Sequence, residues 1–506
     1  MRSKKTLANI LSSLVLQLIT IICGFIVPIL IIGQYGSSVN GLVLSITQFL
    51  GYIVLLEAGV GGVIRSALYE PLAKKNIELV GSTLKAAEKF FRIIGCVFLG
   101  YLIIVAVTMP FLVNNEFEKL FTVSLILIIG ISIFIEYFFG ITYRLLLQAD
   151  QRLYIVSIIQ MFITIINTIA IVYLVHIEAS IHFVKLCSVF IFVLRPVILY
   201  IYVKKKYKIV KNSHSNDISI EQKWDGMGHH LAYFLNSNTD IVVLTIFANI
   251  KEVSVYSVYM LVVTGVRNIT TTFSSGIEAA FGNMLAKGEK QTLEKNFTIF
   301  EFFSFLLVTI LFTSTALLIT PFISVYTFGI TDANYIRPVF AILFVASGAA
   351  YCIRLPYHSI VMAAGHFKQT RNGAFVEAGI NITLSILLVN FYGIVGVAIG
   401  TLSSMTFRSL QYIHYLSKNI LFRSVWLSLR KIAVNISAVL ISALIVSRLS
   451  SSSFDNYVTW VLYACEVVSI VFVITIAINF LFYKKDFINF IGVVKKVSKK
   501  KNDFRS

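Results

Sequence analysis

Long apolar runs separated by short polar segments recur from one end of the chain to the other. A helix of about twenty apolar residues crosses the roughly 30 Å hydrocarbon layer of a bilayer, so runs of this length predict membrane-spanning helices. The pattern predicts an all-α polytopic membrane protein with about fourteen transmembrane helices: 8–32, 40–63, 89–112, 119–142, 154–176, 181–203, 229–250, 253–277, 298–322, 336–359, 369–391, 393–416, 431–449 and 456–482.

Composition supports a membrane protein and excludes several other classes. The 506 residues are 57% hydrophobic and 13% charged, whereas soluble domains are nearer a quarter charged. The first apolar run continues through Pro28 to Ile32 without a small-residue cleavage site, which predicts an uncleaved first span. The five cysteines fall inside apolar runs without paired spacing, so neither a disulfide framework nor a zinc site is expected. The chain lacks a GxxxxGK[ST] phosphate loop, and we expect no cofactor.

The distribution of positive charge predicts the orientation of the spans. Of the 43 lysines and arginines, 34 fall in the segments that are cytoplasmic if the amino terminus is inside. The outer loops and their edges hold only four, at Lys119, Lys251, Arg337 and Arg448. We therefore expect both termini and the linker 204–228 to be cytoplasmic. The net charge of +19 then reflects topology rather than a nucleic-acid partner.

A weak internal repeat divides the chain. At a shift of 213–215 residues, Tyr143-Arg144 aligns with Tyr357-His358 and Arg195 with Arg408. This predicts two six-helix lobes, 1–203 and 229–416, joined by the linker 204–228. Two extra helices, 13 and 14, occupy 417–482, and a basic tail occupies 483–506. Two repeat-related lobes are typical of transporters that bind substrate between them and expose it to alternate sides.

Arginines within the spans suggest an anion site. Arg267, Arg195 and Arg408 lie at mid-depth, Arg354 lies nearer the inner end, and Arg65 and Arg144 lie at the cytoplasmic mouth. Charged groups at this depth usually face an internal cavity. A guanidinium also matches phosphate oxygens with two parallel donors, so these six arginines are candidate ligands for a diphosphate. The alternative is that several reach the inner headgroups or pair with carboxylates.

Carboxylates within the spans suggest a second role. Asp240 lies roughly 17 Å into a layer of about 30 Å, with Asn236 one turn away on the same face. Asp240 either pairs with an arginine such as Arg267 or binds a coupling ion, H⁺ or Na⁺. Glu57 is the candidate for one of the same two roles in the first lobe. Glu136, Glu377 and Glu466 are also intramembrane, without an assigned role.

Several stretches resemble the multidrug/oligosaccharidyl-lipid/polysaccharide exporter (MOP) superfamily, in particular its Wzx-type polysaccharide-repeat-unit flippases. They are GQYGSSVNGLVLSITQFLGYIVLLEAGVGGVIRSAL (33–68), NSNTDIVVLTIFANIKEVSVYSVYMLV (236–262), AAGHFKQTR (363–371) and NFYGIVGVAIGT (390–401). The resemblance implies a secondary transporter, rather than an enzyme, that flips an undecaprenyl-pyrophosphate-linked oligosaccharide across the bacterial inner membrane for surface polysaccharide export. Its implied partners are that lipid-linked oligosaccharide and the polymerase and glycosyltransferases of the same pathway.

Three alternatives remain open at the level of sequence. Peptidoglycan-precursor flippases also have fourteen spans, whereas the drug-extruding branch typically has twelve. A cation-coupled multidrug exporter is therefore a weaker match. A membrane glycosyltransferase or polymerase is disfavoured by the short outer loops, which leave no room for an external catalytic domain.

Overall fold

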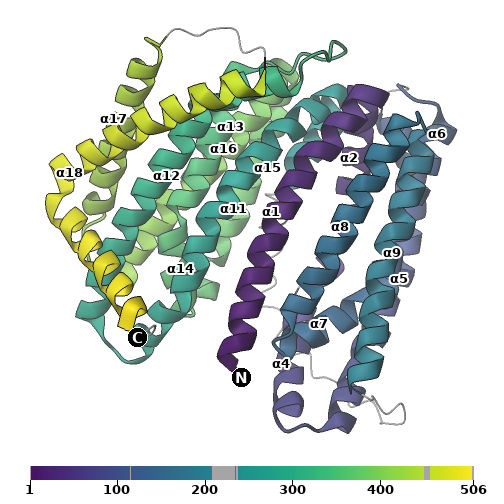
Figure 1. The fold of residues 1–506 in the computed structure, drawn as a ribbon, viewed down its shortest axis with the longest axis horizontal. Helices are drawn as coiled ribbons and strands as arrows, with labels where there is room; N and C mark the ends of the chain where they lie inside the picture. The colour runs from purple at the N-terminus through teal and green to yellow at the C-terminus, as the bar shows by residue number, and fades with distance from the viewer. Residues whose placement is uncertain are drawn as a thin grey trace. The chain divides into compact units, whose positions relative to one another are not determined.

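The computed structural model describes residues 2–57, 59–113, 116–207, 234, 238–449 and 456–503, and every regular element within these ranges is helical (Figure 1). The predicted all-α fold class is confirmed. Helices satisfy all their backbone polar groups internally, which is the condition for crossing lipid.

The first half of the described chain forms nine α-helices and one π-helical turn. They are α1 (Arg2–Tyr35), α2 (Ser37–Gly51), α3 (Val54–Glu57), α4 (Val60–Ala73), α5 (Ile77–Leu112), α6 (Lys119–Ile135), the π-helix η1 (Glu136–Gly140), α7 (Ile141–Ala149), α8 (Leu153–His176) and α9 (Ile181–Tyr207).

The second half begins with a short helix, Asn238–Phe247. It continues with α11 (Ile250–Ala286), α12 (Lys290–Tyr326), α13 (Pro338–Ile353), α14 (Leu355–Ala363), α15 (Phe367–Tyr392), α16 (Ile394–Asn419), α17 (Trp426–Val446) and α18 (Tyr457–Asp503). Helix α18 bends at Tyr483, whose backbone is non-helical, and runs on into the predicted basic tail.

Eleven helical segments of the described chain are long and apolar enough to cross a membrane. The other predicted spans, 253–277 and 393–416, lie within α11 and α16, and 229–250 is described as a helix from Asn238 to Phe247. The predicted span 40–63 matches the candidate span Ser37–Glu57, formed by α2 and α3, whereas its last residues belong to α4. The chain turns after Gly51 and again at Gly59, whose left-handed φ of 83° ends the helical path between α3 and α4.

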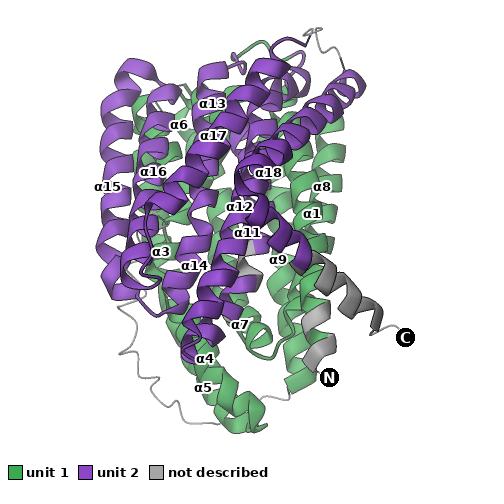
Figure 2. Cartoon of the chain, turned by 90° about the vertical axis from the view of Figure 1, so that its left-hand side faces the viewer, with its two compact units in different colours: residues 1–257, 330–333 green, residues 258–329, 334–506 purple. Residues whose placement is uncertain are grey.

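The chain forms two compact units, coloured separately in Figure 2. Unit 1 comprises Met1–Ser257 and Ile330–Ala333, and unit 2 comprises Val258–Gly329 and Asn334–Ser506. Residues 238–257, which we placed in the second lobe, thus cluster with unit 1. The lobes of the internal repeat stay a prediction, and most of the predicted linker 204–228 lies outside the described residues.

Within each unit, helices distant in sequence pack side by side. In unit 1, α1 packs on α8 and α6 packs on α9 (Figure 1). In unit 2, α16 packs on both α13 and α15, and α17 and α18, the predicted extra helices 13 and 14, pack on α12. Buried apolar side chains such as Leu318, Val446 and Val471 hold α17 and α18 in this position.

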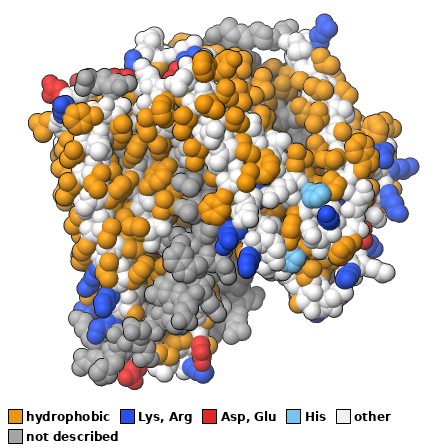
Figure 3. Space-filling model, turned by 180° about the vertical axis from the view of Figure 1, so that it is seen from behind, with side chains coloured by type: hydrophobic (Ala, Val, Ile, Leu, Met, Phe, Trp, Pro, Cys, Tyr) orange, Lys and Arg blue, Asp and Glu red, His pale blue; other side chains and the backbone are white. Residues whose placement is uncertain are grey.

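Large apolar side chains cover much of the outer surface. Examples are Phe111 on α5, Phe162 on α8 and Leu462 on α18, which are 64%, 63% and 67% exposed. Figure 3 shows hydrophobic side chains spread over one face of the molecule. A soluble monomer rarely exposes such an area, whereas lipid chains solvate it without cost. The chain is a multi-pass membrane protein.

Candidate functional site

Two of the predicted arginines meet at one carboxylate in unit 1. Glu136 is the first residue of η1, and its Oε1 lies 2.6 Å from Arg195 Nη2 of α9 and 3.5 Å from Arg144 Nη1 of α7. Arg195 also donates from Nη1 to Gln160 Oε1 of α8 at 2.6 Å. The three charged side chains keep 19–31% of their surface exposed. We call Glu136, Arg144 and Arg195 the open cluster.

The π-helical turn positions the carboxylate of the open cluster. A π turn inserts an extra residue into a helix and occurs often at functional sites. Its last residue is Gly140, where a Cβ atom would lie only 2.8 Å from Glu136 Oε2 and 3.3 Å from Pro196 Cβ. The carboxylate therefore rests against the bare backbone of Gly140, a position that any larger residue would obstruct.

Glu57 and Arg65 lie on neighbouring parts of unit 1. Tyr137 donates to Glu57 Oε2 at 3.3 Å, and the charges of Arg144, Glu136 and Arg65 all act on the Glu57 carboxyl group. Arg65 is exposed and contacts Gln148 at 3.4 Å. The structure thus brings Glu57 close to Arg65, Arg144 and Glu136, and Glu136 in turn contacts Arg195. The predicted depths of these residues in a membrane stay a prediction.

Unit 2 contains a second group built the same way but closed to solvent. Glu377 of α15 lies 2.6 Å from Arg354 and 3.3 Å from Arg408, and the three side chains are only 3–8% exposed. Arg408 also donates to the backbone oxygen of Thr370 at 3.0 Å and to the Tyr412 hydroxyl at 2.8 Å. Arg354 and Arg408 thus make the contacts expected from the alternative to diphosphate binding, in which an arginine within a span pairs with a carboxylate.

Arg267 shares an aromatic ring with Arg354. Its guanidinium carbon lies 4.0 Å from the centre of the Tyr351 ring, and that of Arg354 lies 4.4 Å from the same centre. Such cation–π contacts stabilise a guanidinium by about 0.5–2 kcal/mol. Arg267 is half-buried, so it retains surface for a further ligand.

Asp240 is 3% exposed and accepts a hydrogen bond from the Tyr256 hydroxyl at 2.9 Å, within unit 1. Its pairing with Arg267 stays a prediction, because Arg267 belongs to unit 2. Asn236, the polar neighbour proposed one turn away, lies outside the described residues.

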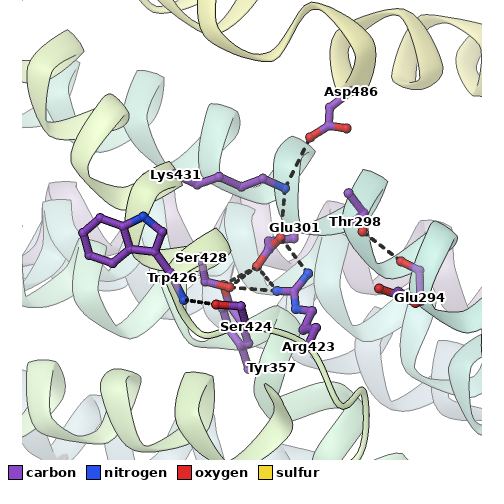
Figure 4. Close-up of polar contacts among 10 residues, drawn as sticks. All are labelled: Glu294, Thr298, Glu301, Tyr357, Arg423, Ser424, Trp426, Ser428, Lys431 and Asp486. Carbon is purple, nitrogen blue, oxygen red and sulfur yellow. Dashed lines mark hydrogen bonds and ion pairs between the residues drawn. The ribbon is translucent and has the colours of Figure 1, made fainter. Parts of the chain in front are cut away.

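A third carboxylate with two cationic partners was missed by the sequence analysis (Figure 4). Glu301 of α12 is fully buried and pairs with Arg423 and with Lys431, whose Nζ lies 2.9 Å from Oε2. Tyr357 and Ser428 donate to Oε1 at 2.5 and 2.7 Å. Glu301 lies three residues inside the predicted span 298–322, so close to its end that a charge there is expected at the lipid headgroups. Its position inside the span was the signal in the sequence that could have identified it.

Within the described residues, one arrangement therefore occurs three times: a glutamate between two basic side chains. Glutamate exposure falls from 25% at Glu136 to 7% at Glu377 and 0% at Glu301. A buried ion pair mainly relieves the desolvation of its own charges, and both Glu301 oxygens are saturated with donors. Of these three groups, the open cluster combines paired arginines with access for a ligand.

No protein-family model matches the chain, and no curated protein matches it. Solved structures match nearly its full length. "Lipid II flippase MurJ, inward closed conformation" has a TM-score of 0.71 at 13% identity, covering 94% of this chain and 99% of that one. The chain has the fold of the MOP-superfamily transporters.

Two drug transporters show the same fold at lower similarity. An inward-facing multidrug-resistance MATE transporter of the MOP superfamily has a TM-score of 0.59 at 12% identity, covering 80% of this chain and 95% of that one. The eukaryotic MATE transporter AtDTX14 has a TM-score of 0.54 at 13% identity, covering 93% and 99%. The names of these three structures describe two transporters and a flippase.

Proposed function

We propose that this protein is a secondary transporter that flips an undecaprenyl-pyrophosphate-linked oligosaccharide repeat unit for surface polysaccharide export. The observation that carries the proposal is the open cluster, in which two arginines within membrane helices remain accessible. A diphosphate carries several acceptor oxygens and matches two guanidinium groups better than one carboxylate does. The likeness of fold to a lipid II flippase supports a lipid-linked substrate.

The arginines divide by accessibility in this proposal. Arg144, Arg195 and Arg65 of unit 1 keep exposed surface and receive the diphosphate as the interior opens inward. Arg267 of unit 2 is half-buried and stays a candidate ligand of its own unit. Arg354 and Arg408 are too buried on Glu377 to reach a ligand, so they hold unit 2 together. The lipid tail stays in the bilayer while the headgroup crosses.

The proposed setting is the bacterial inner membrane, with both termini and the linker 204–228 cytoplasmic. The segregation of basic residues supports this orientation, because positively charged loops stay on the cytoplasmic side. The lipid-linked oligosaccharide would come from glycosyltransferases and pass to a polymerase of the same pathway.

Transport would be driven by a proton or sodium gradient through Asp240, with Glu57 as the second candidate. Asp240→Asn keeps an oxygen that accepts from Tyr256, so the variant should fold and lose gradient dependence. Tyr256→Phe is the matched control, because it removes the hydrogen bond and leaves the carboxylate. Gradient-dependent transport by Asp240→Asn at the wild-type rate would exclude Asp240 as the coupling group.

The test of the proposed function is flipping of the lipid-linked oligosaccharide in proteoliposomes. Arg144→Ala and Arg195→Gln should each lower transport about 10- to 100-fold, as expected for losing a charge-assisted hydrogen bond. Arg195→Lys should restore only part of it, because lysine lacks the planar fork. The control is Arg92→Ala, since Arg92 also pairs with a glutamate of unit 1, Glu88, but is 52% exposed. Normal flipping by both cluster variants would overturn the proposal.

A peptidoglycan-precursor flippase is the second candidate, supported by the TM-score of 0.71 with the lipid II flippase structure, against 0.59 and 0.54 for the two drug transporters. Both substrates carry a diphosphate on a lipid, so the open cluster suits either. Offering the two lipids separately to the same proteoliposomes decides between them. Export of a cationic drug in place of either lipid would support the multidrug alternative, and sugar transfer by the purified protein would support a glycosyltransferase.

A further inference from the structure

Glu136 occupies the position that a phosphate oxygen would take between Arg144 and Arg195. Its Oε1 accepts a hydrogen bond from Arg195 Nη2 at 2.6 Å and forms an ion pair with Arg144 Nη1 at 3.5 Å. While it does so, the three side chains carry a net charge of only +1. An incoming anion must therefore compete with this carboxylate.

The carboxylate leaves part of Arg195 unused. The Nε–H of Arg195 is buried and has no acceptor among the described residues, although Nη1 and Nη2 are both engaged. A guanidinium binds oxyanions best through two parallel donors. A buried donor without a partner is also unfavourable, which indicates that the observed contact is not the best one Arg195 can make.

The local backbone allows the carboxylate to leave. Glu136 is 25% exposed, unlike Glu377 at 7% and Glu301 at 0%, whose oxygens are enclosed by donors. Its Oε2 rests against Gly140 rather than against a donor side chain. The π turn thus places the Glu136 carboxylate so that only one of its two oxygens, Oε1, contacts the arginines.

We propose that Glu136 is an exchangeable counterion. It neutralises Arg144 and Arg195 when the transporter is empty, and the diphosphate of the substrate displaces it. This inference rests on the proposed function and adds a role to it: competition from Glu136 weakens diphosphate binding and allows release on the far side.

The test measures binding of inorganic pyrophosphate to the full-length purified protein by calorimetry, in magnesium-free buffer at constant ionic strength. Glu136→Gln keeps the size of the side chain and removes its charge, so binding should tighten about tenfold or more. The matched control is Glu88→Gln, because Glu88 is similarly exposed at 30% and also faces an arginine in unit 1. Its affinity should equal that of the wild type. In proteoliposomes, Glu136→Gln should show a lower half-saturating substrate concentration and slower turnover.

Gly140→Ala distinguishes displacement of the Glu136 carboxylate from a mere change in the net charge of the protein. The added Cβ, 2.8 Å from Glu136 Oε2, pushes the carboxylate from the arginines while every charge is kept. Gly140→Ala should therefore also tighten pyrophosphate binding, whereas Gly100→Ala, which meets no atom within 4 Å, should not. A lipid-linked diphosphate should compete with pyrophosphate for the same site.

The outcomes distinguish the two proposals. If the wild type binds pyrophosphate and neither Glu136→Gln nor Gly140→Ala binds it more tightly, exchange is wrong and the proposed function stands. If Glu136→Gln alone tightens binding, the effect is one of net charge and exchange is again wrong. If neither pyrophosphate nor the lipid-linked diphosphate binds to wild type or variant, the proposed function fails and the exchange fails with it.

Discussion

At the scale of single residues, three buried or partly buried glutamates are neutralised by the same arrangement of basic side chains but differ in their exposure to solvent. Glu136, Glu377 and Glu301 each face two basic side chains. Removing one partner of a buried pair strands the other, whereas an accessible pair can exchange its partner for a ligand or water. Exposure thus separates Glu136, which a ligand can reach, from Glu377 and Glu301, which are closed to solvent, although all three have the same chemistry.

Glu301 should therefore contribute to stability. Glu301→Gln leaves Arg423 and Lys431 without their buried carboxylate, and breaking such a pair costs about 3–5 kcal/mol. We expect a clearly lower melting temperature in detergent, followed by fluorescence-detected size exclusion. Glu466→Gln, an exposed position on α18, is the control and should melt like the wild type. A wild-type melting temperature for Glu301→Gln would contradict the structural role.

At the scale of elements, α2 makes a close polar contact with residues 238–257 inside unit 1. Asn40 donates to Ser254 at 2.8 Å, and the hydroxyl groups of Ser45 and Thr245 lie 2.7 Å apart. Between them, a Cβ atom on Gly41 would lie 2.1 Å from the backbone oxygen of Ile250. Small residues allow helices to approach at this distance in membranes, where packing and hydrogen bonds replace the hydrophobic effect.

Gly41→Ala should disrupt the contact between α2 and residues 238–257. A backbone oxygen cannot move aside as a flexible side chain does, so we expect a loss of about 1–3 kcal/mol, typical of overpacking. Gly51→Ala lies in the same helix, meets no atom within 4 Å and should be neutral or slightly stabilising. Thermal unfolding of both variants checks this expectation. Equal melting temperatures for the two would show that α2 does not pack this closely.

At the scale of the whole molecule, the charge distribution determines how the chain should sit in the membrane. Most basic residues fall on one predicted side, and the predicted outer loops hold four. Lysine and arginine near span ends are retained on the cytoplasmic side during insertion. This asymmetry is a property of the full set of loops and of no single helix.

Cysteine labelling of intact cells tests the orientation. In a variant without the five native cysteines, Ser213→Cys should be protected from an impermeant reagent and Ser452→Cys should react with it. Permeabilised cells, in which both should react, are the control for folding and expression. Labelling of both positions, or of neither, in intact cells would exclude a model with fourteen spans and cytoplasmic termini.

The sequence by itself determined that this is a helical membrane protein, because span length and apolar composition are local properties of each segment. It also located Arg195, Arg354 and Arg408 as charges inside spans and Arg144 at the cytoplasmic mouth. Only the tertiary structure decided their partners, since Glu136 and Arg195 are 59 residues apart, and Glu301 and Arg423 are 122 apart. No local pattern encodes such a pairing. An apolar pattern likewise does not reveal the π turn at Glu136, whose Gly140 lies close to Pro196 of α9, or the left-handed backbone of Gly59 before α4.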